Sequence, residues 1–224
     1  MAKRIKLSDR QLPDYFKGEE IMNMVTHIVG GGLGIAALVL CVIRAALRGG
    51  ALDVVGAVIY GVSLICLYTM SSVYHGLRPG MGKKVLQVLD HCTIYFLIAG
   101  SYTPVALSAI RPLYPAIGIG LTIAEWALAA LAVTLTAIDL RKYRVFSMIC
   151  YIGMGWGVVL FLPQTLRAMG WGGFGLLLAG GIAYTLGAIL YGIGSKKHWF
   201  HSVFHIFVVL GSVLQFFAIF FYAL

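Results

Sequence analysis

Histidines and carboxylates stand at the edges of long apolar stretches in this sequence. His201 and His205 are four residues apart, so a helix places both imidazoles on one face, one turn apart. Ser71 and His75 have the same spacing, which puts a hydroxyl one turn from an imidazole. Three neutral imidazoles with a fourth position left to water form the usual donor set of a catalytic zinc ion. The pattern predicts a zinc site with His75, His201 and His205 as its ligands.

Asp90 is the carboxylate best placed to work with such a site. It follows His75 across a short turn rich in glycine and proline, so a helical hairpin returns it to a similar depth. We expect it either as a fourth ligand or as the group that orients a water on the metal. Zinc lowers the pKa of bound water to about 7, and a nearby carboxylate can take the proton. Asp90 and Ser71 are therefore the predicted catalytic residues, with Ser71 expected either to stabilise oxyanion charge or to position the scissile carbonyl.

Further polar residues lie close to the first apolar stretch. His27 and the polar residues just before it are expected either to surround the metal ligands or to cap and solvate the start of a helix; these residues are Glu19, Glu20, Asn23 and Thr26, with Glu19, Asn23 and His27 as the predicted neighbours of the ligands. His91 and His198 are interpreted as interfacial residues that do not bind the metal, because a single histidine at a membrane surface usually needs no other role.

The composition indicates which elements carry these residues. Of 224 residues, 60% are hydrophobic and 11% are charged, which excludes a water-soluble globule. We predict an all-α integral membrane protein with seven transmembrane helices, residues 1–22 forming a short cytoplasmic tail and residues 23–224 the membrane domain. The seven apolar stretches are Val25–Ile43, Val54–Val73, Val88–Ile110, Ala116–Ile138, Val145–Leu162, Trp171–Tyr191 and Val203–Tyr222.

Basic residues alternate between the two sides of these stretches. Thirteen of the 17 lysines and arginines fall on the side of the amino terminus, which the positive-inside rule places in the cytoplasm. The carboxyl terminus is then outside, and all six histidines lie at the cytoplasmic side. Because orientation in the bilayer explains the net charge of +9, no nucleic-acid partner is expected. The first twenty residues contain no apolar signal segment.

Taken together, the polar residues resemble those of a known family. The residues that carry the resemblance are Glu19, Asn23, Thr26, His27, Ser71, His75, Asp90, His201 and His205. They resemble the hemolysin III family, the bacterial branch of the progestin and adipoQ receptor group, which is related to alkaline ceramidases. The resemblance implies an intramembrane zinc on the three histidines, a water linked to Asp90, and a cavity open to lipid that admits a ceramide-like amide or another acyl lipid. It also implies an inner-membrane location.

Three functions compete at this point. The first is a zinc-dependent hydrolase or regulator that acts on an amide or ester of membrane lipids at the cytoplasmic leaflet. The second is a pore-forming, cytolytic protein with a structural zinc, although few polar residues besides Glu125 and Gln215 interrupt the apolar stretches. The third is a lipid sensor whose helices shift on binding. The sequence fixes neither the substrate nor the oligomeric state.

Overall fold

The computed structural model describes residues 6–194 and 197–224, and every regular element within these ranges is helical. The predicted all-α class is therefore confirmed. Lys3, Arg4 and Lys196, which contributed to the predicted orientation, lie outside the described residues. The elements are η1 (Leu7–Asp9), α1 (Lys17–Arg48), α2 (Ala51–Gly76), α3 (Met81–Pro104), η2 (Val105–Ile110), α4 (Pro115–Ile138), α5 (Arg144–Gly155), η3 (Gly157–Phe161), α6 (Leu162–Gly194), α7 (Phe200–Ala218) and η4 (Ile219–Ala223).

Six helices in the described part of the chain are long and apolar enough to cross a membrane. One of them, Arg144–Ile193, contains both the fifth and the sixth of the predicted stretches. This 50-residue segment is interrupted, since α5 ends at Gly155, η3 is a 3-10 helix, and Gly170 within α6 has a positive φ of 65°. Glycine is the residue that adopts such a φ without a steric penalty. The length and apolarity of these helices indicate a membrane protein.

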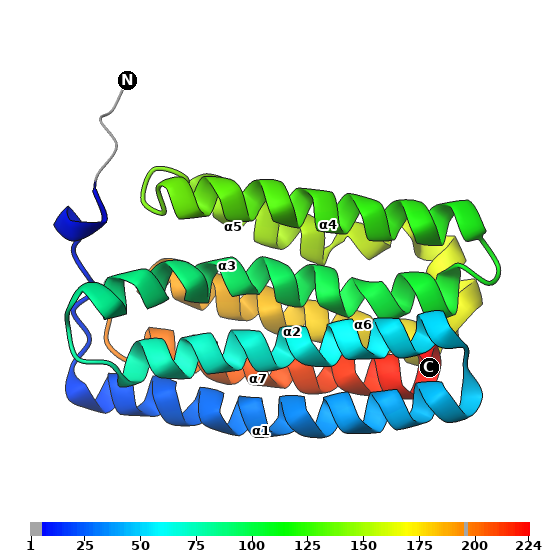
Figure 1. Ribbon diagram of the computed structural model, residues 1–224. Helices are drawn as coiled ribbons and strands as arrows, with labels where there is room; N and C mark the ends of the chain where they lie inside the picture. Colours follow the sequence, from blue (N-terminus) through cyan, green and yellow to red (C-terminus); the bar gives the residue numbers. More distant parts are fainter. Residues whose placement is uncertain (1–5, 195–196) are drawn as a thin grey trace.

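The helices lie side by side in one bundle, with α4 and α5 along the edge opposite to α1 (Figure 1). The main packing pairs are α1 with α2, α2 with α3, and α6 with α7, while α7 also packs on α1. The first and the last long helices are therefore neighbours. The described amino-terminal segment and the carboxyl terminus lie at opposite ends of the bundle (Figure 1).

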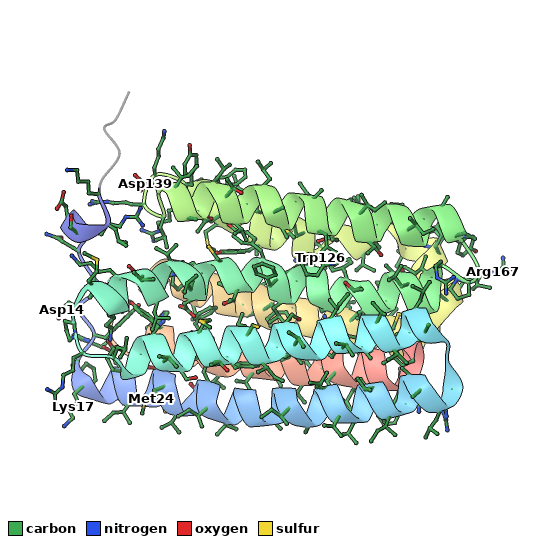
Figure 2. The ribbon with its side chains drawn as sticks, viewed as in Figure 1. Asp14, Lys17, Met24, Trp126, Asp139 and Arg167 are labelled. Carbon is green, nitrogen blue, oxygen red and sulfur yellow. The ribbon has the colours of Figure 1, made fainter. Side chains whose placement is uncertain are left out.

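The outer surface of the bundle is apolar. On α1, Ile28, Val29 and Leu33 are exposed, and similar side chains cover the other helices. Charged residues gather at the ends, with Asp14 and Lys17 at one end and Arg167 at the other (Figure 2). An apolar belt between two charged ends is the surface that a bilayer requires.

Small residues let α1 and α2 approach closely. A Cβ atom on Gly61 of α2 would lie 2.7 Å from the Cα atom of Leu38 on α1, so no larger residue fits without a shift of the backbone. A Cβ atom on Gly30 would lie 2.5 Å from the ring of Tyr68. Close approach through small residues is a common way for helices to associate in lipid, where the hydrophobic effect does not drive them together. This contact fixes α2, and with it the histidine near its end, against α1.

Candidate metal centre

Three buried histidines converge where the end of α2 meets the start of α7. His75 is the penultimate residue of α2, and His201 and His205 occupy the first turns of α7. One ring nitrogen from each of the three lies within 4.8 Å of the others. The Nε2 atom of His201 is 3.4 Å from Nε2 of His75 and 3.1 Å from Nε2 of His205. The three predicted ligands are thus brought together as a group that could bind a metal ion.

The spacing of these nitrogens suits a tetrahedral ion. Metal–nitrogen distances of about 2.0–2.1 Å in tetrahedral geometry place neighbouring nitrogen ligands about 3.3–3.4 Å apart. The two measured Nε2 separations, 3.4 Å and 3.1 Å, lie close to this value. A neutral imidazole has one N–H group, so lone pairs directed at a common point are better satisfied by a cation than by each other. The donor set therefore fits a bound divalent metal.

The start of α7 is held in place by Glu19 of α1. Its Oε1 atom accepts a hydrogen bond from the backbone N–H of Trp199, the residue before α7, and Oε2 accepts one from the N–H of Phe16 at 3.3 Å. Trp199 has a left-handed backbone with φ of 69°. Glu19 thus positions the helix that carries His201 and His205, and it is not hydrogen-bonded to any of the three histidines in the described residues.

Asn23 and His27, one and two turns further along α1, touch the histidines directly. The amide nitrogen of Asn23 is 3.4 Å from Nδ1 of His75, and its Oδ1 atom accepts a hydrogen bond from Ser202 at 2.7 Å. The ring of His27 stacks on His205, with centroids 3.8 Å apart. The face of α1 that was predicted to surround the ligands lies against them, while the roles of these residues remain predictions.

Ser71 and Asp90 lie on α2 and α3 and line the same cavity as His201 and His205. Ser71 is buried, and no hydrogen bond of its hydroxyl occurs within the described part of the chain. The carboxylate of Asp90 is 3.9 Å from Nδ1 of His91. Among the described residues, Asp90 is not part of the group whose ligand atoms lie within 4.8 Å of one another, and its contact with a metal, directly or through water, remains a prediction.

The cavity has a volume of about 160 Å³ and is largely apolar. Its polar end is lined by His201, His205, Ser71 and Asp90, and its other end reaches Val105 of η2 and Gln215 of α7. The 14 residues from His201 to Gln215 span about 21 Å of helix at about 1.5 Å per residue. The histidine cluster therefore lies at one end of a long apolar cavity between the helices.

The remaining histidines and the deepest carboxylate lie outside the cluster. His91 is 3.1 Å from the hydroxyl of Tyr191 and 2.8 Å from the carbonyl of Gln87, and the side chain of His198 is mostly exposed. Neither belongs to the group of three ligands. Glu125 is buried in the middle of α4, where its Oε1 atom faces Gly157 of η3.

Sequence reasoning missed Lys83 and Tyr15, and it did not single out Glu20 from the polar residues around it. Glu20 contacts His75 at 2.6 Å and Lys83 at 2.5 Å. The helical spacing of Glu20, Asn23 and His27, three and then four residues apart, was a signal that all three share one face. Lys83 was counted only as a charge that sets orientation, and its burial could not be seen in the sequence.

Tyr15 precedes α1 and packs over the cluster, against His201. Burial raises the pKa of its phenol far above the usual range, and nearby Glu20 and Asp90 raise it further. Tyr15 is therefore a neutral, largely apolar cover at this end of the bundle.

Known proteins are similar to this chain over nearly its whole length. Residues 16–216 match the family described as Haemolysin-III related. The Hemolysin-3 protein of Bacillus cereus is 39% identical over 210 residues, covering 93% of this chain and 94% of the relative. The Hemolysin-3 homolog of Bacillus subtilis (strain 168) is 37% identical over 204 residues, covering 91% and 94%. The Monocyte to macrophage differentiation factor of Homo sapiens is 27% identical over 169 residues, covering 72% and 67%.

Proposed function

The chain belongs to the haemolysin-III related family, and we propose that it is a zinc-dependent hydrolase of acyl lipids that works within the membrane. The observation that carries this proposal is the convergence of three histidine Nε2 atoms, two of them from His201 and His205, which line the polar end of an apolar cavity. His75, His201 and His205 hold the ion. A set of three imidazoles is typical of catalytic zinc sites, whereas structural zinc sites more often have four protein ligands.

Zinc bound there supplies Lewis-acid chemistry, because it polarises an acyl carbonyl and lowers the pKa of water. The remaining tasks fall to side chains of the cavity. Asp90 takes a proton from the attacking water and returns it to the leaving group, as a general acid–base residue does. Ser71, whose hydroxyl has no partner among the described residues, donates a hydrogen bond to the oxygen on which negative charge develops.

The cavity selects the class of substrate. Its apolar walls extend for about 21 Å from the histidines, which suits a long acyl chain whose carboxyl carbon lies at the polar end. Tyr15 covers the cluster at the end of the bundle, so the substrate enters between helices from the lipid. We propose membrane lipids with an amide or ester bond, including ceramide-like amides, as the partners of this protein.

The catalytic end lies at the cytoplasmic leaflet of the inner membrane in this proposal. Seven spans, with residues 1–22 inside and the domain of residues 23–224 ending outside, account for the opposite positions of the described amino-terminal segment and the carboxyl terminus (Figure 1). A straight helix of the length of Arg144–Ile193 would extend about 75 Å, far more than the hydrocarbon core of about 30 Å. The interruptions at η3 and Gly170 allow this segment to contribute two spans.

The test is turnover by the purified, zinc-loaded protein on a panel of acyl lipids that includes ceramides, N-acyl amino acids and phospholipids. Wild type releases fatty acid from at least one class, and His201→Ala loses both bound zinc and release. His198→Ala, at the exposed histidine, keeps both. A folded protein with full zinc occupancy that cleaves none of these lipids rules the proposal out.

Cytolysis is the second candidate function, and the names of the two Bacillus relatives favour it. A cytolytic protein releases dye from lipid vesicles without producing free fatty acid. If wild type and His75→Ala lyse vesicles equally while no fatty acid appears, the metal centre takes no part in lysis and cytolysis replaces hydrolysis as the leading function.

A further inference from the structure

Glu20 is the carboxylate that contacts a histidine of the metal centre. Its Oε2 atom is 2.6 Å from Nδ1 of His75. An ionised carboxylate only accepts hydrogen bonds, so Nδ1 of His75 carries the proton and donates it. A neutral imidazole has a single N–H group, and Nε2 of His75 is therefore left with a free lone pair. That atom is the one that faces His201 at 3.4 Å.

The neighbouring Asn23 does not compete for this proton. Its amide nitrogen is 3.4 Å from the same Nδ1 atom, a longer contact than the 2.6 Å to Glu20. Ser202 donates a hydrogen bond to Oδ1 of Asn23 at 2.7 Å, which turns the amide nitrogen toward His75. Two donors cannot hydrogen-bond each other, so the carboxylate of Glu20 is the acceptor that sets the tautomer.

Lys83 holds Glu20 in this position. Its ammonium group is 2.5 Å from Oε1 of Glu20 and also donates a hydrogen bond to the carbonyl of Leu77 at 3.0 Å. Lys83 is only 4% exposed, which is rare for a lysine and requires a partner for its charge. The ion pair joins α1 to the first turn of α3 and directs the other carboxylate oxygen at His75 on α2.

His75 differs from the other two proposed ligands because a carboxylate contacts its Nδ1 atom. The Nδ1 atoms of His201 and His205 are buried and have no hydrogen-bond partner among the described residues. Histidines that bind metals commonly donate their second N–H group to a carboxylate or carbonyl, and this contact orients the ring and strengthens the ligand. Only one of the three ligands in the described structure has such a carboxylate.

We propose that Glu20, held by Lys83, is a positioning residue of the metal centre. It fixes His75 in the tautomer whose Nε2 atom is free to bind, and so it increases the affinity for the ion. This inference rests on the proposed function only through the presence of a metal. It assigns different tasks to two adjacent carboxylates, because Glu19 positions the start of α7 whereas Glu20 positions a ligand.

Metal affinity of the full-length protein in detergent tests this assignment. Zinc competition against a calibrated chelator is measured for wild type, Glu20→Ala, Glu20→Gln and Glu125→Gln. Removal of such a partner costs about 10- to 100-fold in metal affinity, so we expect this loss in Glu20→Ala. Glu20→Gln keeps an acceptor for His75 and recovers part of the affinity. Glu125→Gln changes another buried carboxylate, which forms no hydrogen bond to a histidine within the described part of the chain, and we expect this variant to bind zinc as wild type does.

The tautomer of His75 can be measured as a second test, in protein without bound metal. NMR of ¹⁵N-histidine-labelled, metal-free protein shows His75 protonated at Nδ1 in wild type, and a mixture of tautomers in Glu20→Ala. The His75 signal is identified by its absence in His75→Ala. Wild-type zinc affinity and an unchanged tautomer in Glu20→Ala would overturn the role of Glu20 and leave the zinc site intact. Failure of wild type to bind zinc would instead overturn the metal centre itself.

Discussion

The phenol ring of Tyr15 stacks on the imidazole of His201, with ring centroids 4.9 Å apart and planes inclined by 18°. Tyr15 comes from the segment before α1, whereas His201 belongs to the last long helix of the bundle. A residue outside the helices thus covers a candidate metal ligand. We therefore expect this contact to hinder access of water-soluble molecules to the candidate metal centre.

Tyr15→Ala is expected to expose the three histidines to water-soluble molecules at this end of the bundle. Because an aromatic contact contributes about 0.5–1.5 kcal/mol, we expect a hydrophilic chelator to remove zinc about 2- to 10-fold faster from this variant. The rate of zinc release to EDTA is the measurement. Tyr15→Phe keeps the ring and should release zinc at the wild-type rate, and equal rates for all three proteins would show that Tyr15 is not a barrier.

Asp90→Asn and Ser71→Ala separate catalysis from metal binding. The loss of a general acid–base group should lower the rate of fatty-acid release about 10²- to 10⁴-fold, and the loss of an oxyanion donor about 10²- to 10³-fold. Zinc content should stay at the wild-type value, because neither side chain is hydrogen-bonded to a histidine of the cluster in the described residues. Metal analysis beside the assay checks this, and loss of zinc from Asp90→Asn would identify Asp90 as a direct ligand.

Gly181→Phe fills the middle of the cavity. Gly181 lines it, and no atom lies within 4 Å of a Cβ placed there. A steric cost of about 1–3 kcal/mol should reduce cleavage of long-chain substrates about 10-fold or more, and short-chain analogues much less. The control is Gly175→Phe on the same helix, an exposed position with equal room that does not line the cavity. An equal loss of cleavage rate for substrates of all acyl chain lengths would exclude this cavity as the acyl-binding site.

Gly61→Ala tests the close contact of α1 with α2. The new methyl group would meet the backbone of Leu38, so we expect a loss of about 1–3 kcal/mol in stability. Gly32→Ala has open space around its Cβ atom and should not destabilise the protein. Thermal unfolding of both variants in detergent, followed by circular dichroism, gives the comparison. Equal melting temperatures would mean that the helices can move apart without cost.

Much of the fold and the group of three converging histidines could be predicted because both follow from simple spacings. Long apolar stretches predict helices, and His201 and His205 share a face through their four-residue step. His75 was predicted to join them because its stretch ends at the matching depth, and the three do converge. The joined helical segment Arg144–Ile193 was not predicted, since hydropathy falls at Pro163 and Arg167 although the backbone continues as helix to Gly170.

The partners of the ligands were harder to predict. Glu19 and Glu20 are adjacent in sequence, and only the rotation of α1 about its axis decides which carboxylate faces His75. That rotation is set by packing against α2 through Gly30 and Gly61, which a single sequence does not reveal. The burial of Lys83 depends in the same way on where α3 begins beside α1 and α2.

The separation of the ligands along the chain has a consequence for assembly. His75 and His201 are 126 residues apart in sequence, yet their Nε2 atoms are 3.4 Å apart. An ion shared between them acts as a reversible crosslink that closes most of the chain into a loop. In lipid, the hydrophobic effect contributes little to packing between helices. A metal crosslink would therefore stabilise the arrangement in which α7 packs beside α1 and α2. Metal supply would then influence how many newly inserted chains reach their final arrangement.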